Sequence, residues 1–123
     1  MAAPKTSRQP DAVSDLLPAA LQIAVRVQGT TSTLEFAGEW DLGERDAARA
    51  EVERALERVP ECVVLDLSRL SFIDSSGIHV VVTAVKRCAE LGVHIVIIPG
   101  PPQVHRVFEI CQLTTMLPFA TQA

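Results

Sequence analysis

Apolar and polar side chains alternate in two neighbouring segments near the start of the chain, residues 21–27 (LQIAVRV) and 33–37 (TLEFA). Alternation with a period of two is typical of a strand with one buried face. The segment between them, residues 29–32 (GTTS), has the composition of a turn. The pattern predicts a β-hairpin, after which residues 38–43 are expected to leave the sheet.

Two later segments are almost continuously apolar and predict buried strands. They are residues 62–67 (CVVLDL) and 93–98 (VHIVII). Runs of this kind are typical of central parallel strands that are covered on both faces. A closing segment, residues 113–119, is expected to contain one more short strand.

Apolar residues recur at helical spacing in three further segments, residues 46–59, 75–91 and 102–111. Pro60 should end the first helix, Gly92 should end the second as a left-handed residue, and Pro102 suits the first position of the third. On the first helix, Arg49 and Glu53 stand at i,i+4 spacing and are expected to pair.

One face of each of the first two helices is expected to be buried. The first should bury Ala48, Val52, Ala55, Leu56 and Val59. The second should bury Ile78, Val81, Val82, Val85, Cys88 and Ala89.

The order of these elements predicts the fold class. Strands that are joined through helices pair in parallel by right-handed crossovers, whereas the opening hairpin is antiparallel. The sequence therefore predicts one α/β domain over residues 19–123, with a mixed sheet flanked by helices. Residues 1–18 are polar and contain prolines, and we interpret them as a flexible N-terminal arm.

Charge and composition narrow the classes of partner. The formal net charge is −4 and the basic residues are scattered, whereas nucleic-acid-binding domains carry basic patches. No apolar run reaches the roughly 18 residues that a membrane span requires, and residues 1–11 lack the apolar core of a signal peptide. We expect a cytoplasmic protein that neither binds nucleic acid nor inserts into a membrane.

The turn of residues 67–76 leads from a buried strand into the second helix and carries the candidate chemistry. Ser75 is the expected N-cap, Asp74 adds negative charge at the positive end of the helix dipole, and Gly77 permits a close approach. One interpretation is a capped turn with no further role. The other is a hydroxyl positioned for phosphorylation, because free amides at a helix start stabilise a phosphate. The residues alone do not separate Ser75 from Ser76.

Other chemistries have less support. His79, His94 and His105 lie at spacings that match no common metal site. Neither a G-x-S-x-G nucleophile elbow nor a G-x-x-x-x-G-K phosphate loop occurs. We therefore expect no metal, no cofactor and no enzymatic activity. Trp40, beside Asp41, is either a core residue or an anchor for a partner.

Residues 65–78 (LDLSRLSFIDSSGI) resemble the signature of STAS domains, in particular those of bacterial anti-sigma factor antagonists. Residues 38–42 (GEWDL) are similar to that family's early Gly-Glu-Leu-Asp segment, and the resemblance covers about residues 20–119. The chain departs from the family at His79, where a small residue is usual, and at Trp40, where an aliphatic residue is common. Residues 111–113 (CQL) also lack the family's usual glycine.

The resemblance implies a partner-switching cycle in transcription regulation and stress response. The unphosphorylated domain binds an anti-sigma factor that is also a serine kinase, and so frees a sigma factor. The kinase phosphorylates the first serine after the aspartate, which is Ser75 here, and a PP2C-type phosphatase resets it; Ser76 is the alternative site. The expected partner-binding residues are Trp40, Asp41, Asp74, Ser75, Ser76, Gly77 and His79. The alternative function is a non-phosphorylated STAS scaffold or accessory subunit of a stress-signalling or lipid-transport complex.

Overall fold

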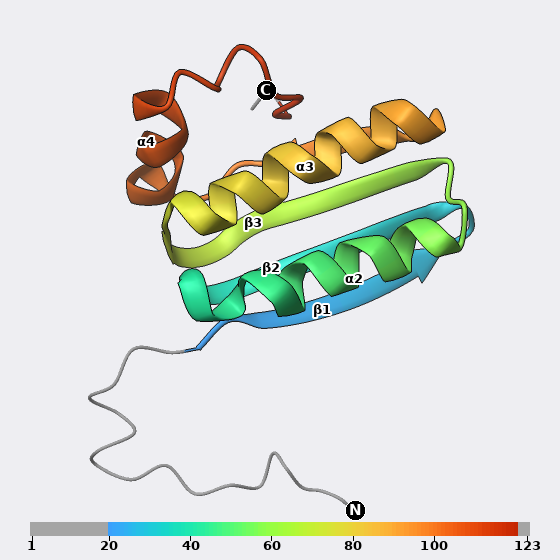
Figure 1. Cartoon of the computed structure of the whole chain (residues 1–123), viewed down its shortest axis with the longest axis horizontal. Coiled ribbons are helices and arrows are strands. Elements are labelled where there is room, and N and C mark those ends of the chain that lie inside the picture. The colour runs from blue at the N-terminus through green and yellow to red at the C-terminus, as the bar shows by residue number, and fades with distance from the viewer. Residues whose placement is uncertain (1–19, 121–123) are drawn as a thin grey trace, which may run out of the picture.

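The computed structural model describes residues 20–120, which form one mixed β-sheet with helices packed against it (Figure 1). The four strands stand in the order β1-β2-β3-β4. They are β1 (Gln22–Gln28), β2 (Thr31–Trp40), β3 (Cys62–Ile73) and β4 (His94–Ile98). The β1–β2 pair is antiparallel, and the β2–β3 and β3–β4 pairs are parallel. The predicted hairpin and the α/β class with a mixed sheet are confirmed. The arm expected at residues 1–18 lies outside the described residues.

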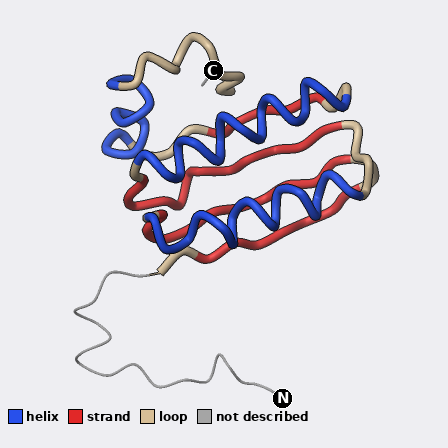
Figure 2. The backbone as a smooth tube through the Cα atoms, in the orientation of Figure 1, coloured by secondary structure: helices blue, strands red, loops and turns tan. Residues whose placement is uncertain are grey.

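The two longer helices lie next to each other across one face of the sheet (Figure 2). They are α2 (Arg45–Glu57), which contacts β2, and α3 (Ser75–Leu91), which contacts β3 and β4. A single 3₁₀ turn, η2 (Leu42–Glu44), precedes α2, and α4 (Pro102–Ile110) follows β4. The sheet, α2 and α3 therefore enclose the core between them.

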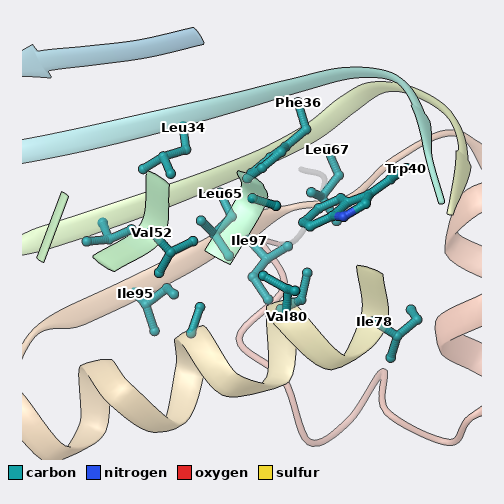
Figure 3. Packing of buried hydrophobic residues seen from close by; sticks show 14 of the residues in the cluster. Leu34, Phe36, Trp40, Val52, Leu65, Leu67, Ile78, Val80, Ile95 and Ile97 are labelled. Carbon is teal, nitrogen blue, oxygen red and sulfur yellow. The ribbon is translucent and has the colours of Figure 1, made fainter. Parts of the chain in front are cut away.

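The core is built from neighbouring strands and the facing sides of α2 and α3 (Figure 3). Leu34, Leu65 and Ile97 stand on adjacent strands and are at most 1% exposed. At the end of β2, the indole of Trp40 stacks on the ring of Phe36 with centroids 4.5 Å apart. Burial of side chains of this size contributes roughly 1.5–3 kcal/mol each. The burial of Trp40 therefore holds the end of β2 against the start of α3.

The prediction that β3 is covered on both faces is wrong. Burial alternates along the strand: Val63, Leu65 and Leu67 are buried, whereas Cys62 and Val64 are half-buried. Because α2 and α3 share one face of the sheet, only alternate side chains of β3 reach the core. The expectation that residues 38–43 leave the sheet is also wrong in its first part, since β2 continues to Trp40.

Several helix boundaries are confirmed. The helix α3 begins at Ser75 and ends at Leu91, followed by Gly92 with a left-handed φ of 73°, and α4 begins at Pro102. The first helix is shorter than predicted and ends at Glu57. Val59 is therefore 79% exposed with a φ of 51°, and the prediction that it is buried is wrong. The physical reason is Pro60, which disfavours helical geometry in the residue before it.

The buried face of α3 is rotated about the helix axis relative to the predicted face. Val82 and Val85 are only half-buried and Ala89 is exposed, whereas Val80 and Ala84 are buried. Val80, Ala84 and Cys88 follow one another at i,i+4 spacing, so they lie on one side of the helix. Ile78, Val81 and Cys88 are buried as predicted.

The ion pair expected within α2 is replaced by one between helices. The Nε and Nη2 atoms of Arg87 on α3 both donate to the carboxylate of Glu53, at 3.0 Å each. Arg49 is a neighbour of Glu53 that contributes only at longer range. The pair ties α3 to α2 along their solvent side.

The closing segment forms a single bridge and no full strand. Phe119 pairs in parallel with Ile97 at the free edge of β4. The Ile97 N–H donates to the Pro118 carbonyl at 2.9 Å, and the Ala120 N–H donates to the Ile97 carbonyl at 2.7 Å. The expected extra strand is thus reduced to one residue pair.

Candidate functional site

The start of α3 is capped by an aspartate. Asp74 has the extended backbone of an N-cap residue, and its Oδ1 accepts hydrogen bonds from the N–H groups of Ser76 (2.9 Å) and Gly77 (3.3 Å). The prediction that Ser75 is the N-cap is therefore wrong by one position, because aspartate caps as well as serine and its charge also suits the helix dipole. Ser75 is instead the first residue of the helix.

The two serines of the turn differ in what their hydroxyl groups do. The Ser76 side chain is buried, with 8% of the residue exposed, and its Oγ donates to Oδ1 of Asp74 at 2.5 Å. Ser75 is exposed. An enzyme approaching from solvent therefore reaches the Ser75 hydroxyl, whereas the Ser76 hydroxyl is engaged by the cap.

Three of the amides at the helix start, those of Ser76, Gly77 and Ile78, are already occupied. Besides the Ser76 and Gly77 amides on the Asp74 side chain, the Ile78 N–H donates to the Asp74 carbonyl at 3.1 Å. These three amides are therefore not free to receive a phosphate in this structure, whereas free amides are expected there from the sequence. A phosphate on Ser75 would instead stand near the Asp74 carboxylate and extend toward solvent.

Gly77 allows a close approach by the protein's own core. A Cβ atom there would lie 2.7 Å from Cγ1 of Ile73 and 3.0 Å from Cδ2 of Trp40. Gly77 is itself buried. Gly77 is expected to contact the partner, but its burial leaves it little surface to do so, because the space above it is filled by Ile73 and the indole of Trp40.

Trp40 is a core residue. Its side chain is 0% exposed and stacks on Phe36, so the structure selects the first of the two interpretations, and Trp40 offers no side-chain contact to a partner. The backbone of Trp40 nevertheless contacts the site. The Trp40 carbonyl accepts from the Asp74 N–H at 3.2 Å, which joins the end of β2 to the capping residue.

Asp41 and His79 complete the exposed part of the site. Asp41 follows Trp40 directly, is exposed, and orders the η2 turn by accepting from the Gly43 N–H at 3.1 Å. The helix α3 contacts this turn. His79 is exposed one helical turn after Ser75, on the same side of α3. Asp41, Ser75 and His79 therefore lie around one end of the sheet.

One exposed aromatic residue was missed by the sequence reasoning. Phe72 stands two residues before Asp74 and is 45% exposed. The odd-numbered residues Val63, Leu65 and Ile73 of β3 are buried, so alternation alone places Phe72 away from the core. The register shifts in the pairing with β2 change the burial of Arg69 and Leu70 instead. The signal that could have found Phe72 is an aromatic residue directly before a candidate site.

The remaining candidate chemistry does not converge on this site. His94 lies on β4 and His105 on α4, and among residues 20–120 no three histidine, cysteine or acidic side chains gather as metal ligands would. Within the same residues, no helix has the length and apolarity needed to cross a bilayer.

Comparison with known proteins shows relatives for most of the chain. The sequence model of the family described as "STAS domain" matches residues 22–122. The chain is similar to the anti-sigma F factor antagonist of Paenibacillus polymyxa, with 29% identity over 99 residues that cover 80% of this chain and 85% of that protein.

Solved structures share the fold. An anti-sigma factor antagonist from Mycobacterium paratuberculosis matches with a TM-score of 0.76 and 17% identity, over 84% of this chain and 87% of that one. The anti-sigma factor antagonist SpoIIAA in its unphosphorylated form matches with a TM-score of 0.68 and 25% identity, over 84% and 90%. The phosphorylated form of SpoIIAA from Bacillus matches with a TM-score of 0.63 and 24% identity, over 84% and 93%.

Proposed function

The chain belongs to the STAS domain family, and from this premise we propose that it is an anti-sigma factor antagonist controlled by phosphorylation of Ser75. The unphosphorylated protein binds a cognate anti-sigma factor that is also a serine kinase, and this frees the sigma factor. The domain acts by binding and not as an enzyme, and it works in the cytoplasm, where its partners are. The names of its relatives support the class of function.

One observation carries this proposal: of the two adjacent serines, Ser75 presents an exposed hydroxyl while Ser76 is buried against Asp74. Asp41 and His79 lie exposed around it and are the side chains we propose as partner contacts. Asp74 and Ser76 hold the turn in place, because the Ser76 N–H and hydroxyl both donate to the Asp74 carboxylate.

The switch is electrostatic. The kinase transfers the γ-phosphoryl group of ATP to Oγ of Ser75, the hydroxyl proton is released and ADP leaves. The PP2C-type phosphatase reverses this with water and releases inorganic phosphate. The product carries a charge of about −2 at one exposed atom, next to the carboxylate of Asp74. Because Ser75 is exposed, the fold persists on phosphorylation while the binding surface repels its partner. The existence of SpoIIAA structures in both states of phosphorylation supports a switch of this kind.

Binding of a kinase-type anti-sigma factor from the same organism tests the proposal. Calorimetry should give equal affinity for the wild type and Ser75→Ala in the absence of ATP, and at least tenfold weaker binding for Ser75→Asp. With ATP, the wild type should lose binding while Ser75→Ala keeps it.

Ala89→Asp is the matched control. Residue 89 is exposed on the same helix, about 20 Å from Ser75 by helical rise, so it adds equal charge away from the site. Unchanged binding of Ser75→Asp, or equal weakening by Ala89→Asp, would refute the switch. An intact complex whose protein never acquires phosphate favours the scaffold function instead.

A further inference from the structure

The strand β1 ends the sheet, and its outer side is open within residues 20–120. The side chains of Val25 and Val27 are 37% and 49% exposed there. In the register with β2, Ile23, Val25 and Val27 pair with Phe36, Leu34 and Ser32, and so they stand on the face that α2 and α3 cover. An apolar row therefore continues from the core to the edge of the sheet.

This edge lacks the features that usually prevent strand addition. Proteins protect edge strands with proline, lysine, bulges or inward-pointing charges. The sequence of β1 is QIAVRVQ, and its pairing with β2 runs through seven consecutive residues without a register shift. Its one charged residue, Arg26, forms an ion pair with Glu35 of β2. Arg26 and Glu35 stand on the opposite face from the valines, so they do not guard the apolar row.

The sequence of β1 is nearly symmetric about its centre. We propose that β1 pairs antiparallel with β1 of a second copy of this chain, about a two-fold axis at Val25. The pairing places Val25 opposite Val25, Ile23 opposite Val27, Ala24 opposite Arg26 and Gln22 opposite Gln28. Directly opposite residues share a face, so every apolar residue of the row meets another. All seven residues of β1 take part.

A competing register is less favourable on the same grounds. If the two-fold axis passed through Arg26, the two guanidinium groups would stand directly opposite each other, and like charges in that position destabilise a strand pair. The residues of α2 and its C-cap beside Val25 carry both signs of charge, in Glu51, Arg54 and Arg58. They therefore present no single-sign barrier to a second copy.

The dimer leaves the candidate site accessible. Ser75 follows β3, which is separated from the β1 edge by β2. One pair of short strands is a small interface by the standard of roughly 1,200–2,000 Å² for stable complexes. The dimer is therefore expected to dissociate on dilution, and a covalent trap is the most suitable detection method.

Cysteine cross-linking tests the pairing and its register. In the full chain carrying Cys111→Ser, which removes an exposed thiol, Val25→Cys places two thiols opposite each other across the axis. The Cα atoms of directly opposite residues are about 4.5–5.5 Å apart, within the range of a disulfide. Val27→Cys is the matched control, because its two copies would be separated by four residues, about 13 Å.

Mild oxidation should convert most of the Val25→Cys protein to a disulfide-linked dimer and little of the Val27→Cys protein. The double variant Ile23→Cys with Val27→Cys should cross-link again, since residues 23 and 27 face each other in this register. Equal cross-linking of the Val25→Cys and Val27→Cys proteins, or none in either, overturns the proposal; it would mean another register, or another occupant of this edge.

A charge swap provides the second test. Val25→Lys and Val25→Asp should each weaken self-association at least tenfold in sedimentation, because each opposes its own copy across the axis. An equimolar mixture of the two should restore the dimer. Ile110→Lys, at a residue 73% exposed on α4, should leave association unchanged. A mixture that stays monomeric while both variants remain folded by circular dichroism contradicts pairing about Val25.

Discussion

At the scale of single residues, the site depends on backbone and core contacts more than on its exposed side chains. Asp74 is held from three directions: it caps α3, its N–H reaches the Trp40 carbonyl, and it accepts from the Ser76 hydroxyl. Gly77 lets the indole of Trp40 lie against the first turn of the helix. The exposed Ser75 therefore lies on a turn that is held in place by the contacts of Asp74 and Gly77.

Replacing Gly77 tests this close packing. Gly77→Ala should lower the free energy of unfolding by about 1–3 kcal/mol, because its Cβ would lie 2.7 Å from Ile73 and the neighbours are core atoms with little room to move. This loss should exceed the gain of up to about 1 kcal/mol that alanine gives in a helix. Urea denaturation measures the difference.

Gly43→Ala is the control for that substitution. A Cβ at Gly43 would meet only Oδ1 of Asp41 at an ordinary 3.5 Å. Its stability should stay within about 0.5 kcal/mol of the wild type. Equal stability of the Gly77→Ala and wild-type proteins would show that the first turn of α3 does not pack closely on Trp40.

At the scale of elements, α2 and α3 are joined by the Glu53–Arg87 ion pair on their solvent side. The two hydrogen bonds from Arg87 lower the pKa of Glu53 below its ordinary value of 4.5. Both side chains are more than a third exposed, which limits the energy of the pair. Its contribution is fully present above the unfolded-state pKa and is lost as the pH falls through the lower folded-state value.

Glu53→Gln should therefore reduce stability at pH 7 and remove part of its decline in acid. The measurement is the urea midpoint of both proteins at pH 7 and at pH 3, where the two should converge. Glu57→Gln, on an exposed residue of the same helix, should follow the wild type at both values. A gap between the Glu53→Gln protein and the wild type that widens in acid would contradict the assigned role.

The sequence predicts elements better than it predicts their edges. The hairpin, the start of α3 at Ser75 and its end before Gly92 follow from alternation, capping residues and glycine, which act locally. The choice of the buried face of α3 and the ion-pair partner of Glu53 both depend on how α3 packs against α2 and the sheet. A local sequence pattern carries no information about that packing. The second half of β3 follows a bulged pairing with β2, so Leu70 is buried and Arg69 is exposed, against simple alternation.

Within the candidate site too, local sequence signals are predictable and features that depend on packing are not. The motif predicts a capped turn before α3, which the structure contains, and the resemblance points to Ser75 within it. Burial in the folded chain shows that Trp40 is a core residue, and it leaves Ser75 as the more accessible of the two serines. The N-cap was assigned to Ser75 because serine and aspartate cap equally well, and only the backbone of the turn distinguishes them.

At the scale of the whole molecule, the sheet separates two surfaces. The site lies where β2 and β3 end, at the start of α3, and the apolar edge of β1 lies on the other side of β2. The net charge of −4 would become about −6 on phosphorylation. The change falls on one exposed residue, so the core contacts of Trp40 and Phe36 should be the same in both states.

The most direct measurement is phosphopeptide mapping after reaction of the full chain with ATP and the kinase-type anti-sigma factor of its own organism. The account predicts one phosphate, on Ser75, and none in the Ser75→Ala protein. Phosphate on Ser76, or continued phosphorylation of the Ser75→Ala protein in the same turn, would contradict the claim that the exposed hydroxyl at the start of α3 is the switch.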